Sequence, residues 1–73
     1  MTENLHVVPN GDEWAVNRDR GKRNIRNFPN QQDAIDFAIP LAKNDEVELS
    51  IHGKDGKIRD KRSYGNDPYP PKG

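Results

Sequence analysis

The first part of the chain contains three short segments whose pattern predicts β-strands. The run Leu5–Val8 ends at an Asn-Gly pair, which favours a hairpin because both central residues of a type I′ turn need positive φ. Trp14 and Val16 then alternate with smaller or polar residues, which is the period of a strand with one buried face. A polar turn at Asp19–Lys22 leads into a third strand over Asn24–Phe28. We therefore expect a three-stranded antiparallel meander.

An amphipathic helix is predicted after the third strand. Asn30 is a good N-cap, and Asp33 places negative charge in the positively polarised first turn. From Gln31 onward, apolar residues recur at three- and four-residue spacing, which gives the helix one face to lay on a sheet. Pro40 lies inside this pattern, and an interior proline costs about 3 kcal/mol, so we expect a kink or an early loosening there and an end by Asp45. The apolar stripe comprises Ala34, Ile35, Ala38, Leu41 and Ala42, with Phe37 on its flank.

Two further strands follow the helix. Val47, Leu49 and Ile51 alternate with polar residues, which predicts a strand with one apolar side. Gly53–Gly56 closes a second hairpin into a strand within Lys57–Tyr64. The element order is therefore βββαββ. The fold class is α+β, with an antiparallel β-sheet and one helix packed on one face.

Length and composition allow one domain. With 73 residues, of which 30% are hydrophobic, the chain can build only a small core. We place the domain at residues 1–64. Residues 65–73 are rich in proline and glycine and lack packing periodicity, so we expect an extended C-terminal tail. Pro68–Pro71 has the spacing of a weak polyproline recognition motif, and the alternative is a tail that lies against the sheet through Tyr64 and Tyr69.

Composition also bears on the compartment. The chain has no cysteine, so it cannot form the disulfide framework common in small secreted domains. The N-terminus lacks the features of a signal peptide, and no apolar stretch approaches the roughly 20 residues of a membrane span. We expect a cytoplasmic bacterial domain that is neither exported nor inserted into a membrane.

Several segments of the chain together form a recognisable pattern. They are His6–Pro9, Gly11-Asp12 and Trp14, Ala34-Ile35 and Ala38, Glu48–Ile58, and Ser63–Pro68. With these segments the chain resembles a family of small bacterial and phage-associated domains of unknown function. The resemblance covers nearly the whole chain. It implies a compact helix-on-sheet fold and brings no catalytic residue, cofactor or established partner. Asn30 and Pro40 depart from the pattern, which has threonine at the cap and an unbroken helix.

Side chains suited to catalysis are few. Thr2, Ser50 and Ser63 are the hydroxyl residues of the Ser/Thr type, and His6 and His52 are the histidines. A nucleophile, a base and an acid would have to be drawn from this small set. Neither a P-loop nor a GxGxxG motif is present. We therefore expect a protein that is not an enzyme and uses no cofactor.

A metal site receives little support from the sequence. His6 and His52 could approach one another if their strands are neighbours, and Glu48 could join them as an acidic ligand. However, these residues do not have the spacing of a ligand motif. We favour two half-exposed strand histidines and expect no metal.

Charge is distributed unevenly although the net charge is zero. The two hairpins are rich in Lys and Arg, whereas the helix and the strand after it are acidic. If the helix covers one side of the sheet, strand alternation should send Arg26, Lys57, Arg59 and Lys61 toward the uncovered side. A basic open sheet with basic loops could follow a phosphate backbone. The candidate nucleic-acid-binding residues are Arg18, Arg20, Lys22, Arg23 and Arg26, with Lys57, Arg59 and Lys61 as a second group.

Two functional hypotheses remain open at this point. The first is a small non-catalytic binding module whose partner is nucleic acid. Against it, readers of single strands need exposed aromatic residues, whereas Trp14 and Phe28 are needed for the core. The second is a protein-interaction or structural module, homodimeric through an uncovered strand edge or bound to another protein. Its charges would form a solvated surface or meet an oppositely charged partner.

Overall fold

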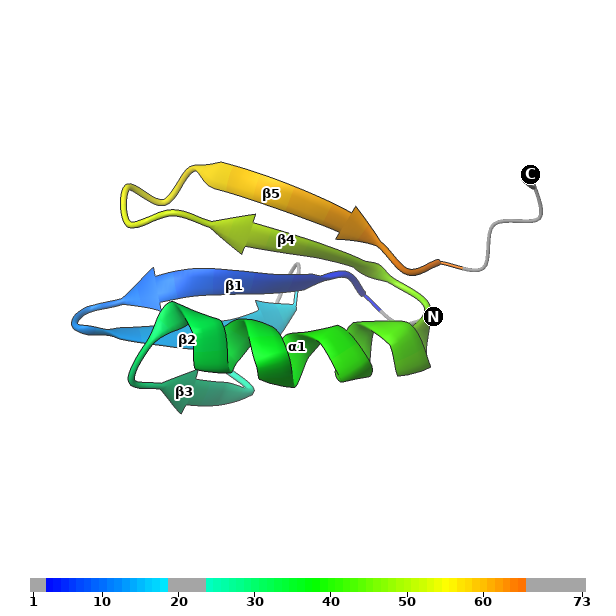
Figure 1. Ribbon diagram of the computed structural model, residues 1–73, viewed down its shortest axis with the longest axis horizontal. Coiled ribbons are helices and arrows are strands. Elements are labelled where there is room, and N and C mark those ends of the chain that lie inside the picture. Colours follow the sequence, from blue (N-terminus) through cyan, green and yellow to red (C-terminus); the bar gives the residue numbers. More distant parts are fainter. Residues whose placement is uncertain (1–2, 19–23, 66–73) are drawn as a thin grey trace.

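The computed structural model describes residues 3–18 and 24–65. Within this part of the chain, strands and helix follow in the predicted order βββαββ, so the α+β class with one helix on a sheet is confirmed. Figure 1 shows the helix lying in front of the sheet, with its axis close to the strand direction. The elements are β1 (Leu5–Asn10), β2 (Glu13–Arg18), β3 (Arg26–Phe28), α1 (Gln31–Asp45), β4 (Glu48–His52) and β5 (Ile58–Ser63).

The sheet has the strand order β3-β2-β1-β4-β5 and is mixed. The pairs β1–β2, β2–β3 and β4–β5 are antiparallel. The central pair β1–β4 is parallel, with Leu5 opposite Leu49 and Val7 opposite Ile51. The prediction of an antiparallel sheet was therefore wrong at this pair. The reason is the helix, which carries the chain back along the sheet so that β4 starts at the same end as β1.

The β1–β2 turn differs from the predicted type. Asn10 pairs with Glu13, so the two turn residues are Gly11 and Asp12. Gly11 has a φ of 64°, and among the described non-glycine residues positive φ occurs at Glu46, not at Asp12. Positive φ at the first central position, occupied by glycine, is the pattern of a type II′ turn. The Asn-Gly pair thus predicted the hairpin correctly, but the turn residues and the turn type were predicted wrongly.

The third strand is shorter than the predicted range of 24–28. It runs over Arg26–Phe28, although the backbone N–H of Ile25 still donates to the carbonyl of Val16 at 2.7 Å. Ile25, on which the predicted strand was centred, is 44% exposed. Backbone hydrogen bonding to β2 therefore begins at Ile25. Of the residues of β3, Phe28 packs against the core.

The core lies between α1 and one face of the sheet. The helix contributes small side chains, because its fully buried residues are alanines spaced by four positions. Small residues let the helix axis come close to the sheet, and the strands supply the bulk. Ile35 and Leu41, which the sequence predicted within the stripe, flank it and are half-buried. The buried residues are Ala34, Ala38 and Ala42 on the helix, and Leu5, Val7, Trp14, Val16, Val47, Leu49 and Ile51 on and beside the strands.

The helix is continuous through Pro40, so the expected loosening is not found. Pro40 removes the donor that would bond the carbonyl of Asp36. Both residues are exposed, so this carbonyl lies on the solvated side of the helix, where water can satisfy it. At the start of the helix the predicted cap is confirmed, because the Asn30 side chain accepts a hydrogen bond from the backbone N–H of Asp33 at 2.9 Å. The described residues contain no helix that is both long and apolar enough to cross a membrane.

The end of the helix is closed by a Schellman motif with a strained residue. The N–H of Glu46 donates to the carbonyl of Lys43 at 3.3 Å, and that of Val47 donates to Ala42 at 3.1 Å. Glu46 has φ 58° and ψ 50°, the left-handed conformation in which glycine is usually found. For a residue with a Cβ atom this conformation costs roughly 1–2 kcal/mol. The bonds of the motif, together with buried Val47, hold Glu46 in place.

We expect Glu46→Gly to stabilise the domain by about 0.5–1 kcal/mol, because glycine avoids the left-handed strain but loses more entropy on folding. Urea denaturation would measure the change. Asn44→Gly is the matched control: it lies in the helical last turn, where glycine should cost a few tenths of a kcal/mol. Destabilisation by Glu46→Gly would contradict the proposed strain.

Candidate functional site

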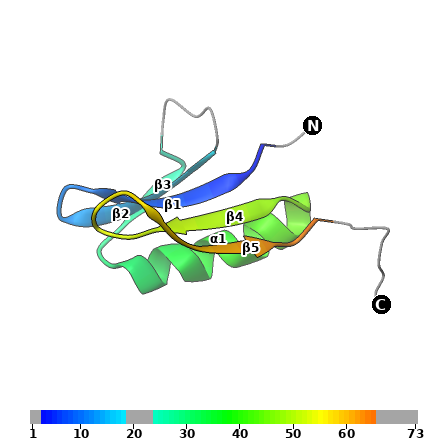
Figure 2. The same cartoon turned by 90° about the horizontal axis from the view of Figure 1, so that it is seen from above.

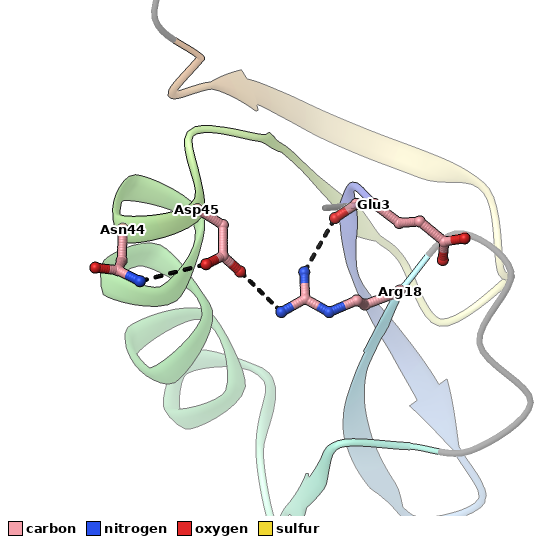
Figure 3. Close-up of polar contacts among 4 residues, drawn as sticks. All are labelled: Glu3, Arg18, Asn44 and Asp45. Carbon is pink, nitrogen blue, oxygen red and sulfur yellow. Dashed lines mark hydrogen bonds and ion pairs between the residues drawn. The ribbon is translucent and has the colours of Figure 1, made fainter. Parts of the chain in front are cut away.

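Arg18, the first of the candidate nucleic-acid-binding residues, is engaged within the protein. Its Nη2 donates to Asp45 Oδ2 at 2.8 Å, and its Nη1 donates to the carbonyl of Glu3 at 3.0 Å. Asn44 donates to the other carboxylate oxygen of Asp45 at 3.3 Å (Figure 3). The Arg18 and Asp45 side chains are 28% and 16% exposed. This ion pair joins the end of β2, the end of α1 and the N-terminal segment.

Arg26 lies on the helix side of the sheet, which corrects the expected placement on the uncovered side. Its guanidinium carbon lies 5.4 Å from the ring centroid of Phe28 and 5.9 Å from that of Phe37 on α1. The strand register explains this position. Arg26 is opposite Val16, and Phe28 is opposite Trp14, so Arg26 shares the face of these buried residues.

The basic residues of the second hairpin lie on both sides of β5. Lys61 is opposite Ser50, and its Nζ lies 3.7 Å from Glu48 Oε1 on the uncovered side, as predicted. Arg59 lies on the helix side instead, where it lines a hollow with Gln31 and Ile51. The cause is an irregularity between Ile51 and His52, where the register skips Arg59 and so breaks the alternation. Lys57 is exposed in the loop before β5.

The candidate basic residues therefore do not form one surface in the described part of the chain. Arg20, Lys22 and Arg23 lie outside the described residues. Arg26 is on β3 and Lys61 on β5, the two outer strands of the sheet. Four strand spacings place these strands about 19 Å apart. A ligand that contacts both would have to span the whole sheet.

The sheet face opposite α1 carries fewer charges than the chain as a whole. None of the described elements covers it, as Figure 2 shows from the β5 edge. Its charged residues are Glu13 at the hairpin tip and the Glu48–Lys61 pair at β4 and β5, whereas 33% of the whole chain is charged. We define the uncovered face by register as His6, Val8, Asn10, Glu13, Ala15, Asn17, Ile25, Asn27, Glu48, Ser50, His52, Ile58, Lys61 and Ser63.

Apolar residues lie at both sides of the uncovered face and in its centre. Ile25 and Ile58 are 44% and 52% exposed, and they are the large hydrophobic residues that the described structure exposes. Val8 and Ala15 are directly opposite one another on β1 and β2. The face thus combines apolar groups with polar groups that carry no charge.

Amide side chains form a hydrogen-bonded chain on the β1–β2–β3 half of the uncovered face. Asn10 Nδ2 and Asn24 Nδ2 both donate to Asn27 Oδ1 at 3.3 Å, and Asn17 Nδ2 donates to Asn24 Oδ1 at 3.3 Å. These bonds fix the amides relative to one another. They also leave the surface polar without adding charge.

On the β1–β4 half, the two histidines meet. His6 Nδ1 lies 3.0 Å from His52 Nε2, and His52 Nδ1 lies 2.8 Å from the carbonyl oxygen of Gly56. The parallel β1–β4 pairing makes their strands neighbours, which was the condition set for their approach. A carbonyl only accepts, so His52 Nδ1 carries the proton and its Nε2 accepts from His6 Nδ1. Ser50, beside them, is 3% exposed.

Two shallow hollows lie away from the uncovered face's centre. The larger, about 310 Å³, is lined by Trp14, Asp12 and Lys54 at the loop end of the sheet. The smaller, about 190 Å³, lies between α1 and β5. In its wall, hydrogen bonds to Tyr64 and then to Asp60 raise the pKa of Arg62 above its ordinary value. Neither hollow gathers a histidine or a hydroxyl nucleophile. No group of three His, Cys, Asp or Glu residues in the described chain could hold a metal ion.

Comparison with known proteins gives a family match over most of the chain. A family model described as an uncharacterized protein conserved in bacteria (DUF2188) matches residues 5–64. The chain belongs to this family. The resemblance to a bacterial family of unknown function is therefore confirmed. The matched range of this DUF2188 domain begins with β1 and ends one residue after β5. No curated protein and no solved structure gives a significant match.

The composition of the uncovered face of the DUF2188 domain was not predicted from the sequence, because the prediction rested on the basic residues. The signal was present in the alternate positions of the strands. His6, Val8 and Asn10 follow one another at spacing two, as do Ala15 and Asn17. What the sequence did not supply was the parallel register that joins β1 to β4 and brings His52 beside His6.

The ion pair of Arg18 can be tested by a double-mutant cycle with Arg18→Met and Asp45→Asn. We expect a coupling energy of about 0.5–1 kcal/mol, at the upper end for exposed pairs because both groups are partly buried. Thermal unfolding of the four proteins would give this value, and it should shrink at high salt. The unfavourable interaction of the Asp45 charge with the helix dipole is present with and without Arg18, so it cancels from the coupling energy. A coupling energy near zero would show that the ion pair between Arg18 and Asp45 does not stabilise the domain.

Proposed function

We propose that this DUF2188 domain is a non-catalytic protein-interaction module that binds through the uncovered face. The observation that carries the proposal is the reduced charge of this face, where Glu13, Glu48 and Lys61 are the charged residues among fourteen positions, in a chain that is one-third charged. The cores of protein interfaces are depleted in charged residues. The hydrogen-bonded asparagine amides supply uncharged donors and acceptors for a partner.

The partner to which we commit is a second copy of the chain. A face that contacts its own copy must be complementary to itself. A surface of one charge sign would repel its copy, whereas the uncovered face is neutral in its centre and pairs Glu48 with Lys61 at its rim. Exposed Ile25 and Ile58, on opposite sides of the face, offer apolar contacts that two-fold symmetry would use twice.

Size sets the expected strength of this association. Five strands at about 4.8 Å spacing and about 18 Å length give a flat footprint near 350 Å². A standard interface buries about 800 Å² per partner. We therefore expect a weak dimer, with a dissociation constant of about 10 μM to 1 mM.

Sedimentation equilibrium between about 5 μM and 2 mM would test the dimer, because this range brackets the expected dissociation constant of about 10 μM to 1 mM. The apparent mass of the wild type should rise toward twice that of the monomer. The double variant Ile25→Lys/Ile58→Lys should remain monomeric, since it places like charges across the symmetric contact. Both positions are exposed, so the fold should tolerate the change.

Gln32→Lys/Asn44→Lys is the matched control, because it adds the same two charges to exposed positions of α1, away from the uncovered face. It should associate like the wild type. A wild type that stays monomeric up to about 2 mM, or a control that loses association equally, would exclude the proposed dimer.

Nucleic-acid binding stays a prediction. It is favoured by the exposed basic residues of the β4–β5 hairpin, among them Lys54 and Lys57, and disfavoured by the internal contacts of Arg18 and Arg26. Fluorescence anisotropy with short DNA and RNA at about 50 and 200 mM salt would decide, because affinity based on phosphate contacts must fall steeply between them. If binding occurs, Arg20→Glu/Arg23→Glu/Arg26→Glu should abolish it without unfolding the domain. Binding retained by the folded triple variant would exclude these residues as the site.

The absence of catalysis is part of the same proposal. It is supported by the lack of a nucleophile aligned with a base in either described hollow. The one serine near the histidines, Ser50, is 3% exposed and so is closed to a substrate.

A further inference from the structure

The two histidines offer a second use of the uncovered face. They are the only histidines of the chain, which also has no cysteine. They come from the neighbouring strands β1 and β4, and both are half-buried. Their ring centroids are 5.2 Å apart with an interplanar angle of 44°, and the facing nitrogens, His6 Nδ1 and His52 Nε2, are 3.0 Å apart.

The position of His52 resembles that of a histidine prepared to bind a metal. Metal-bound histidines usually donate their second ring N–H to a carbonyl or carboxylate, which fixes the tautomer and the ring orientation. His52 Nδ1 donates to the carbonyl of Gly56 at 2.8 Å. Its Nε2 lone pair is therefore directed toward His6.

We propose that His6 Nδ1 and His52 Nε2 form a two-imidazole site for a divalent transition-metal ion of the Cu²⁺, Ni²⁺ and Zn²⁺ class. Imidazole suits these ions. At nitrogen–metal distances of about 2.05 Å and a tetrahedral angle, the two nitrogens would be about 3.3 Å apart. The observed 3.0 Å needs an opening of only a few tenths of an ångström, which tilting of the two rings supplies.

Binding requires a change of tautomer at His6. In the hydrogen-bonded pair the proton between the rings belongs to His6 Nδ1. The metal takes the place of this proton, which moves through solvent to Nε2 of the same ring, so no net proton is released. His52 keeps its proton on Nδ1 and its bond to Gly56. The two histidines therefore respond differently to the metal, which gives the site a distinct signature.

The surroundings favour an open site. No third His, Cys, Asp or Glu of the described chain joins the pair into a cluster. The remaining coordination positions are filled by water or by donors of a bound molecule, as in metal sites that exchange ligands. Ser50, the Cα partner of His6, carries no charge, and Lys61 on the next strand is paired with Glu48. The site does not depend on the proposed dimer.

The experiment uses protein without an affinity tag, and the variant Ile25→Lys, which weakens the proposed dimer, is measured beside the wild type. Cu²⁺ should bind at one ion per chain, and its electron paramagnetic resonance spectrum should show coupling to two imidazole nitrogens. With Zn²⁺, nitrogen NMR should show the proton of His6 moving from Nδ1 to Nε2, with His52 unchanged. Ile25→Lys should bind metal like the wild type, because it leaves Ile58, the Cα partner of His52, unaltered.

His6→Gln and His52→Gln should each weaken Zn²⁺ binding by more than about tenfold in calorimetry, because loss of even an outer-shell partner costs about 10–100-fold. Lys61→Gln, on the same face, is the control and should bind normally. If a histidine variant does not fold, the NMR signature of the wild type decides. Binding that persists unchanged in both histidine variants, or absence of the tautomer change at saturating Zn²⁺, would overturn the proposal.

Discussion

One helix has to cover a five-stranded sheet, and most features of the domain follow from this limit. A helix with its side chains is about 10–12 Å wide, whereas the outer strands are about 19 Å apart. The alanine stripe of α1 compensates by bringing the helix close to the central strands. At the β3 side, Phe28 and Phe37 fill the remaining space beneath Arg26. On the β5 side, charged Asp60 and Arg62 border the smaller hollow between the helix and the strand.

The opposite face of the sheet has no covering layer in the described chain, and its composition is unusual for a solvated surface. Charged residues are concentrated on the helix, the loops and β5, while uncharged polar residues and the apolar Val8 and Ala15 occupy the middle of the uncovered face. Lys and Glu would keep such a face solvated and apart from partners. Neutral side chains that are already bonded to one another lose little on being covered by protein. The protein-interaction hypothesis rests on this contrast rather than on any single residue.

The sequence predicted local features better than long-range ones. The alternation in Val47–Ile51, the cap at Asn30 and both hairpins were readable because each depends on neighbouring residues. The parallel register of β1 and β4 was not, since it joins residues 44 positions apart, as in the Leu5–Leu49 pair. The side on which Arg26 lies was predicted wrongly. Phe28 pairs with buried Trp14 and faces the helix, and Arg26, two residues before Phe28, must face the same way in spite of its charge. Arg59 could not be placed because an irregular pairing breaks the alternation that the prediction assumed.

The parallel pairing also has a consequence for how the chain folds. The β1–β2–β3 meander and the β4–β5 hairpin are local units that can begin to form independently, but small isolated strand units are marginal in water. Joining them requires closing the long segment between β1 and β4, and this loss of entropy comes before the core contacts compensate for it. The central strand pair is therefore expected to form in or just before the rate-limiting step. Once it forms, the helix and both hairpins become part of one cooperative unit.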